Sequence, residues 1–174
     1  MSKNLIIYYS RKGENYVNGS IVKLTKGNTE IAAEFIRKAA GGDLFEIDTV
    51  KSYADSYMEC IDEAKAELRN QERPELRNYL DSISDYDNIF ICGPCWWGTY
   101  PMAMFTQLER LDFTGKRVLP LMTHEGSGLS GSMKDIKRIC RGADIADGLA
   151  VRGADVSDSE KAIAEWVSGN LRNR

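Results

Sequence analysis

The residues best suited to chemistry lie in three short segments, each following an apolar run. The first segment begins with the hydroxyl of Ser10 and ends with Gly27-Asn28-Thr29, directly before a helical pattern. A hydroxyl, amides freed by glycine and a helix N-terminus together form a cradle for phosphate. An ordinary strand-to-helix loop with a threonine cap has the same composition. Neither G-x-G-x-x-G nor Gly-Lys-Ser/Thr occurs here, so the segment predicts a site for a phosphate group but not for ATP.

The second segment is the most specific of the three. It reads Gly93-Pro-Cys-Trp-Trp-Gly-Thr-Tyr-Pro101 and crowds large aromatic residues into a loop at the end of an apolar run. Aromatic side chains in such a place favour stacking on a flat ring, and glycine allows the backbone to approach it closely. Either tryptophan alone is also consistent with packing under a neighbouring helix. We predict that Trp97 contacts the ring rather than Trp96, because Trp97 adjoins Gly98.

The third segment is Thr123-His-Glu-Gly-Ser-Gly-Leu-Ser-Gly131, which is rich in amides and hydroxyls. It can bond the polar edge of the same ring, or it can be a solvated turn leading into a helix. The only histidine, His124, is more typical of a loop residue bonded to backbone than of a catalytic acid, with a modest electrostatic role left open.

The cysteines suggest a different chemistry. Cys92-Gly-Pro-Cys95 matches the active-site tetrapeptide of thioredoxin, which predicts a thiol-disulfide protein as an alternative. The thioredoxin pair opens a helix, however, whereas Cys92 falls within an apolar run and Cys95 precedes an aromatic loop. Two cysteines and His124 provide too few ligands for a structural zinc, so no metal site is predicted.

The elements that position these segments alternate along the chain. Continuous apolar runs predict buried strands, and apolar residues at helical spacing predict helices between them. The predicted strands are Asn4–Tyr9, Leu44–Ile47, Asn88–Gly93, Val118–Thr123 and Gly148–Val151, and the predicted helices are Thr29–Ala40, Tyr57–Glu72 (polar and exposed), Ala103–Leu111, Gly131–Cys140 and Ser157–Leu171. This order predicts a doubly wound α/β fold, in which ligands bind outside the carboxyl ends of the strands.

Length and composition limit the classes of function. The chain has 174 residues, 43% of them hydrophobic and 28% charged, which predicts one globular domain spanning 1–174. A net charge of -3 provides no attraction for nucleic acid. No apolar run approaches the ~20 residues of a membrane span. Four scattered cysteines favour a reducing compartment, so we expect free thiols and a cytoplasmic protein.

Taken together, the three segments resemble those of the flavodoxin family, and in particular flavodoxin-like proteins with Trp-Trp-Gly and Thr-His-Glu-Gly-Ser-Gly loops. The resemblance runs from Asn4 to about Val167. It implies a three-layer α/β fold with a five-stranded parallel sheet of order 2-1-3-4-5, and non-covalent FMN at the carboxyl ends of its strands. The implied cofactor-binding residues are Ser10, Lys12, Gly27, Asn28 and Thr29 at the phosphate, Pro94, Cys95, Trp96, Trp97 and Gly98 beside the isoalloxazine, and Thr123, His124, Glu125, Gly126 and Gly128 at its pyrimidine side.

The chain departs from the family pattern in two respects. Residues 13–26 separate Ser10 from Gly27-Asn28-Thr29, and Asn18-Gly19 within them predicts an inserted β-hairpin. Lys12-Gly-Glu-Asn15 resembles Lys26-Gly-Asn-Thr29, and we favour the second copy for phosphate because it adjoins the helix. The net charge is the other departure, because flavodoxins that shuttle electrons are strongly acidic.

The resemblance predicts a protein whose redox chemistry occurs at FMN, with no side chain identified as acid, base or nucleophile. Its partner is then either a redox protein, for an electron carrier, or NAD(P)H with a quinone or nitroaromatic acceptor, for an oxidoreductase. Two alternatives remain: a thiol-disulfide protein using Cys92 and Cys95, and a flavodoxin-like binding module that has lost FMN.

Overall fold

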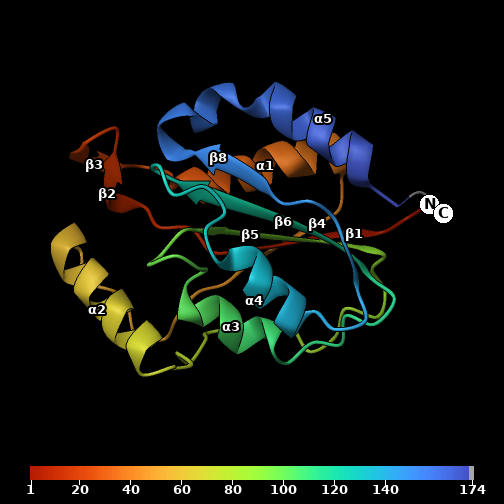
Figure 1. Ribbon diagram of the computed structural model, residues 1–174, viewed down its shortest axis with the longest axis horizontal. Helices are drawn as coiled ribbons and strands as arrows, with labels where there is room; N and C mark the ends of the chain where they lie inside the picture. Colours follow the sequence, from red (N-terminus) through yellow and green to blue (C-terminus); the bar gives the residue numbers. More distant parts are fainter. Residues whose placement is uncertain (173–174) are drawn as a thin grey trace.

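The computed structural model describes residues 1–172 and has a central sheet between two layers of helices (Figure 1). The sheet is parallel throughout, with the order β4-β1-β5-β6 followed by β7 and β8, which both pair with β6. Its strands are β1 (Asn4–Tyr8), β4 (Asp43–Glu46), β5 (Asn88–Pro94), β6 (Arg117–His124), β7 (Asp144–Ile145) and β8 (Leu149–Arg152). The predicted α/β class and the order of the first four sheet positions are confirmed.

Helices cover both faces of the sheet (Figure 1). One layer contains α1 (Asn28–Ala40) and α5 (Glu160–Asn170), and the other contains α2 (Tyr57–Arg69), α3 (Met102–Leu108) and α4 (Ser132–Ile139). A 3-10 helix, η1 (Gly153–Asp158), occupies the residues where the last helix was predicted to begin, so α5 starts at Glu160. No helix among the described residues has both the length and the apolar composition needed to cross a bilayer.

The central strands β1, β5 and β6 are largely apolar because both faces of the sheet are covered there. Along β1, side chains alternate between the two sides. Leu5 and Ile7 pack into the core shared with α3, whereas Ile6 and Tyr8 pack into the core shared with α1 and α5. The continuous apolar runs in the sequence therefore correspond to strands buried on two sides.

The predicted number of strands is wrong, because two short strands occupy the fifth position. The interruption has a cause in β6. The Val118 carbonyl accepts a hydrogen bond from the Ala146 N–H at 2.8 Å, so Val118 directs its backbone groups toward the fifth position. Pro120, two residues further, faces the same way and has no N–H to donate. The ladder breaks there, with β7 pairing before Pro120 and β8 after it.

A separate hairpin lies between β1 and α1. It consists of β2 (Gly13–Val17) and β3 (Ser20–Leu24), which form a two-stranded antiparallel sheet. Asn18 and Gly19 form its turn with φ of 51° and 85°, the left-handed values that a tight two-residue turn of this kind requires. The hairpin lies at one end of the molecule, beside the end of the sheet where α1 and α2 begin (Figure 1).

Candidate functional site

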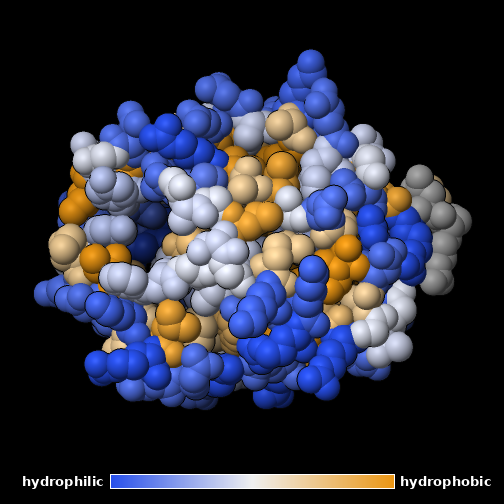
Figure 2. Space-filling model, in the orientation of Figure 1, coloured by the Kyte–Doolittle hydropathy of each residue, from blue (hydrophilic) through white to orange (hydrophobic). Residues whose placement is uncertain are grey.

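A cavity of about 440 Å³ opens at the carboxyl ends of β1, β5 and β6. The molecule is visibly hollowed on the side where Figure 1 places β2, β3 and α2 (Figure 2). The cavity walls come from the ends of the three strands and the loops after them, from the hairpin, from the first turns of α1 and α2, and from Gly153. It is thus at the position that the sequence predicts for a ligand.

The cavity brings the three predicted segments together. The predicted site residues that line it are Asn28, Thr29, Pro94, Cys95, Trp96, Trp97, Thr123, His124, Glu125 and Gly126. Five predicted residues do not line it: Ser10, Lys12, Gly27, Gly98 and Gly128. The Cys95 N–H donates to the Thr123 carbonyl at 2.8 Å, and this bond joins the second segment to the third.

Ser10 and Gly27 shape the start of α1 instead of facing the cavity. The Ser10 hydroxyl accepts a hydrogen bond from the Glu30 N–H at 3.0 Å. A Cβ at Gly27 would lie 2.1 Å from Ser10 Oγ, so only glycine fits in this contact. The preceding N–H groups, of Asn28 and Thr29, belong to the first turn of a helix and have no acceptor within it. This first turn is therefore suited to binding an anion. Lys12 is exposed and outside the cavity.

Two buried threonines link the first and third segments at the floor of the cavity. The hydroxyls of Thr29 and Thr123 lie 2.8 Å apart and share a hydrogen bond. Because each hydroxyl has one proton, one threonine donates to the other and the second keeps its proton for another acceptor. The pair can thus provide one further donor to a ligand.

The two tryptophans have different surroundings. Trp96 packs edge-on against Tyr9 and Tyr53, with ring centroids 5.2 and 5.0 Å apart, and so belongs partly to the core. Trp97 is 47% exposed, and its indole Nε1 donates to the Ile61 carbonyl of α2 at 2.8 Å. Of the two, Trp97 has the freer ring, although both line the cavity.

Trp97 and Gly98 form a tight turn in which both residues are left-handed, with φ of 55° and 88°. The Trp96 N–H donates to the Thr99 carbonyl across this turn at 2.8 Å. A left-handed conformation costs a bulky residue roughly 1–2 kcal/mol, and such strain is concentrated at functional sites. The turn therefore has a conformation that local sequence preference alone would not select.

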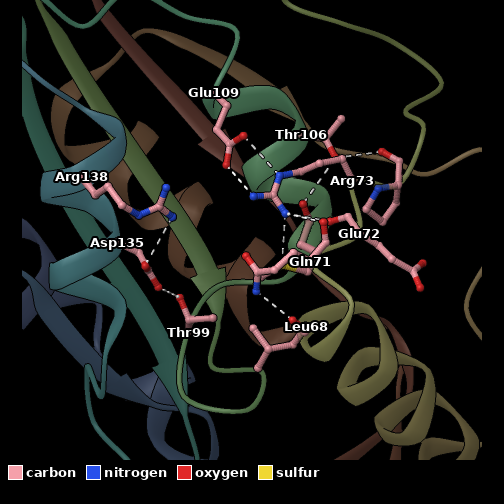
Figure 3. Close-up of polar contacts among 11 residues, drawn as sticks. Leu68, Gln71, Glu72, Arg73, Thr99, Thr106, Glu109, Asp135 and Arg138 are labelled. Carbon is pink, nitrogen blue, oxygen red and sulfur yellow. Dashed lines mark hydrogen bonds and ion pairs between the residues drawn. The ribbon is translucent and has the colours of Figure 1, made fainter.

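Helix α4 holds this turn from behind. The Gly98 carbonyl accepts from the Gly131 N–H at 2.8 Å, and the Thr99 hydroxyl donates to Asp135 at 2.6 Å. Arg138 lies 3.5 Å from the other oxygen of Asp135 (Figure 3). The Gly98 carbonyl therefore faces α4, while the Trp97 ring faces α2.

A second polar contact fixes α3 relative to the segment after α2. Arg73 approaches both carboxylate oxygens of Glu109 at 2.8 and 3.2 Å (Figure 3). The guanidinium also lies 5.2 Å from the Phe105 ring centroid. A forked arginine-carboxylate pair has a defined geometry, so it fixes where α2 ends relative to α3.

The third segment is held by its own side chains. His124 Nδ1 accepts from the Gly126 N–H at 2.9 Å, which leaves the proton of the neutral ring on Nε2. The Ser127 hydroxyl lies 3.3 Å from Cys95 Sγ. His124 is thus bonded to backbone, and its free nitrogen is a donor.

Glu125 is less simple than the sequence predicts. Its Oε2 accepts from the Asn18 N–H of the hairpin turn at 3.0 Å, and Arg152 Nε lies 3.9 Å away. Its Oε1 is buried and has no partner among the described residues. A Cβ at Gly153 would lie 2.5 Å from this oxygen. Glu125 therefore joins the cavity wall to both the hairpin and the end of β8.

The sequence analysis missed the wall formed by α2. That helix was predicted to be polar and exposed, but its first turns line the cavity through Tyr57, Cys60, Ile61 and Ala64. These positions follow the i, i+3, i+4, i+7 spacing of one helical face, a signal that was available in the sequence. Burial raises the pKa of the Cys60 thiol to about 11. The other missed residues are Arg11, Asn15, Tyr16, Ser127 and Gly153.

The four cysteines are free thiols. Cys92 is 0% exposed and packs on the α1 and α5 side, where burial raises its thiol pKa far above the usual range. Cys95 lies beyond the strand, in the cavity wall. A low thiol pKa is the feature that makes a C-x-x-C pair reactive, and Cys92 has the opposite. No group of three or more histidine, cysteine or acidic residues among residues 1–172 is placed to hold a metal ion.

The cavity has the features that a ligand with a phosphate tail and a flat aromatic head requires. The first turn of α1 and the Thr29–Thr123 pair are suited to a phosphate. Trp97 and Tyr57 provide aromatic surface, and His124, the last residue of β6, provides a hydrogen-bond donor. FMN, which the sequence resemblance implies, has both groups.

Comparisons with known proteins agree with this geometry. The family model described as Flavodoxin matches residues 21–170. A candidate flavoprotein from Bacteroides eggerthii is 26% identical, with a TM-score of 0.77 over 99% of this chain and 100% of that one. A candidate flavoprotein from Bacteroides uniformis is 27% identical, with a TM-score of 0.73 over 96% and 98%.

A more distant structure, a flavoprotein from Lactobacillus acidophilus in complex with FMN, shares the fold. It is 20% identical, with a TM-score of 0.63 over 92% of this chain and 99% of that one. No match to a curated protein was found. Because the family model matches most of its length, the chain belongs to the flavodoxin family.

Proposed function

We propose that this chain binds FMN non-covalently in the cavity and acts as an FMN-dependent redox protein. One observation carries the proposal: segments from the carboxyl ends of three parallel strands enclose a single cavity that has a phosphate cradle and aromatic walls. Family membership and the FMN complex of the Lactobacillus acidophilus flavoprotein support it. When bound, FMN supplies hydride or single-electron transfer, and the protein supplies binding and orientation.

The residues that would hold FMN follow from their places in the cavity. The first N–H groups of α1, with one hydroxyl of the Thr29–Thr123 pair, would bind the phosphate. The Trp97 ring would contact the isoalloxazine, and His124 Nε2 would donate to its pyrimidine edge. Pro94, Cys95 and Gly126 complete the wall.

The proposed site also depends on residues that do not line the cavity. Gly27 and Ser10 would keep the cradle open, because they set the backbone before α1. Gly98 would act through the turn that presents Trp97, and Gly128 through the third segment. Lys12 has no place in this proposal, because its side chain is exposed and does not line the cavity.

A flavin titration tests the proposal. The purified protein should be yellow, and the apoprotein should bind one FMN per chain, with riboflavin binding more weakly. A colourless protein that does not bind added FMN would overturn the proposal and favour a flavodoxin-like module without a cofactor. Redox-active thiols would then be tested directly with Cys95→Ser.

Two finer roles fit the proposed FMN site: an electron carrier between proteins, and an NAD(P)H-dependent oxidoreductase acting on quinones or nitroaromatics. The net charge of -3 provides little of the field that steers a carrier onto a basic partner. A steady-state screen of NADH and NADPH against both acceptor classes separates the roles. Turnover identifies an enzyme, whereas reduction only through a partner reductase identifies a carrier.

A further inference from the structure

The β2–β3 hairpin extends along the cavity wall from α2 to the end of β8. Asn15 and Tyr16 of β2 line the cavity, and the Tyr16 ring stacks on Tyr57 of α2 with centroids 6.1 Å apart. At the other end of the hairpin, the Asn18 turn contacts Glu125 and Arg152. The hairpin therefore touches both sides of the cavity and borders its interior.

The base of the hairpin is held firmly. Arg11 donates to the Glu14 carbonyl at 2.9 Å and to the Ala54 carbonyl at 2.8 Å. The Glu14 carboxylate accepts from the Tyr57 N–H at the start of α2, at 2.7 Å. Contacts to the start of α2 and to the loop before it thus fix this end.

The tip of the hairpin is held by one cluster, which we call the clasp: Asn18, Glu125 and Arg152. Glu125 Oε2 accepts from the Asn18 N–H at 3.0 Å, and Arg152 Nη2 donates to Asn18 Oδ1 at 3.0 Å. Arg152 Nε lies 3.9 Å from Glu125 Oε2, which closes the cluster. Because the Arg152 side chain is 45% exposed, water competes for these contacts.

Between base and tip, β2 contacts α2 through the stacked rings of Tyr16 and Tyr57, whereas the outer strand β3 is mostly exposed. In the outer strand β3, Ile21 is 48% exposed and Val22 is 36% exposed. A two-stranded hairpin alone is at best marginally stable in water. Its position over the cavity therefore depends on this ring contact, which lies on the α2 side, and on the two ends of the hairpin. The tip lies farther from α2 than the ring contact and the base, so it is the end that opens first.

We propose that this hairpin is a strap over the bound cofactor, and that the clasp holds it shut. The inference rests on the proposed binding of FMN in the cavity. Glu125 links the two functions, because it lines the cavity and forms part of the clasp. FMN leaves when the clasp opens and the tip swings away from β8, with the base as the hinge.

The test is the dissociation rate of the flavin, measured by recovery of its fluorescence after rapid dilution of the loaded full-length protein. Asn18→Gly removes the acceptor of Arg152 but suits the left-handed turn, so the hairpin keeps its fold. Arg152→Ala removes the same contact from the other side. Each variant should release FMN about tenfold faster. Riboflavin should be released faster by the same factor, because the strap covers the cavity and does not select the phosphate.

Glu34→Gln is the matched control. It breaks an exposed ion pair between Glu34 and Lys26, 2.7 Å apart, in which neither residue lines the cavity. Its release rate should equal that of the wild type. The proposal would be overturned if both clasp variants released FMN at a rate within twofold of the wild type. It would also be overturned if the variants released FMN faster but not riboflavin.

A failure of the proposed function gives a different result: the wild-type protein then binds neither flavin. In that case, amide hydrogen exchange still tests whether the clasp holds the hairpin shut. The N–H groups of β2 and β3 should exchange several times faster in Asn18→Gly than in Glu34→Gln, because the clasp limits opening of the hairpin. Equal exchange in the two variants would overturn the proposal.

Discussion

The two ends of the central sheet differ in how their polar groups are used. At the amino end, Asn88 is fully buried; its amide nitrogen donates to Asn4 Oδ1 and to the Arg172 carbonyl, and its amide oxygen accepts from the Arg172 N–H, all between 2.9 and 3.2 Å. At the carboxyl end, Trp97 has a left-handed backbone, and Glu125 has a buried oxygen that finds no partner within residues 1–172. The amino end stabilises the fold, and the carboxyl end retains strain and polar groups that a ligand can use.

The largest effect that this comparison predicts comes from Asn88→Ala. The change leaves the buried Asn4 amide oxygen without its donor, so the free energy of unfolding should fall by about 2–3 kcal/mol. Urea denaturation measures the loss, and the exposed Asn70→Ala is the control. The FMN affinity of the folded variant should be unchanged. A parallel loss of affinity would show that the two ends are coupled.

Trp97→Ala, at the carboxyl end, should act on ligand binding, whereas Asn88→Ala acts on stability. If its ring stacks on the flavin, truncation should cost about 1–3 kcal/mol of binding, the scale measured for stacking on nucleobases. This is a tenfold to hundredfold rise in Kd. FMN fluorescence, quenched by a nearby indole, should recover in the variant at saturating protein. If Trp96→Ala has these effects and Trp97→Ala does not, the wrong tryptophan has been chosen; if neither does, the stacking role fails.

Thr29→Ala should give a smaller and more selective effect. FMN binding should weaken about tenfold, equivalent to ~1.4 kcal/mol, while riboflavin binding changes much less, because only FMN has the phosphate. Thr123→Ala, which removes the other hydroxyl of the pair, is the companion variant. Titration of both ligands with both variants measures the selectivity. An equal loss for FMN and riboflavin would place the phosphate elsewhere.

The smallest effect is expected from the cysteines. Cys95→Ser and Cys92→Ala should leave the rate of reduction of bound FMN within twofold of wild type. In the native protein a thiol reagent should modify Cys95 and leave Cys92 unmodified, because burial raises the pKa of Cys92 and removes its reactive thiolate. Loss of flavin reduction with FMN still bound would restore the dithiol hypothesis.

The sequence predicted the sheet well, because continuous apolar runs mark its central strands, and three of these runs end where a chemically unusual segment begins. The split of the fifth strand was missed, although Pro120 marked it. The surroundings of the two tryptophans were not predictable, since Trp96 is distinguished by contacts with Tyr9 and Tyr53, which lie far away in the sequence. Two adjacent tryptophans look the same in the sequence, so the sequence alone cannot show which of them packs against distant aromatic residues.

The hairpin contacts were beyond sequence reasoning for the same reason. Asn18-Gly19 indicated a turn, but nothing local to it indicates that its N–H is bonded to Glu125, 107 positions away. The role of α2 in the cavity wall was accessible, because its Tyr57, Cys60, Ile61 and Ala64 share a face. Reading the helix as merely polar gave too much weight to composition and too little to periodicity.

The amino end of the sheet has a practical consequence for engineering. The Ser2 hydroxyl donates to the Arg172 carbonyl at 2.8 Å, so Ser2 and Arg172 lie side by side, at the end of the sheet away from the hairpin and α2 (Figure 1). A short linker joining them would make the chain circular, and cutting between Asn18 and Gly19 would place the new chain ends at the tip of the hairpin. Such a circular permutant keeps the order of the strands in the sheet, while the hairpin beside the cavity is cut at its turn. A surface or a fused domain can then be attached at the new ends, beside the site, or within the linker at the old ends, far from the site.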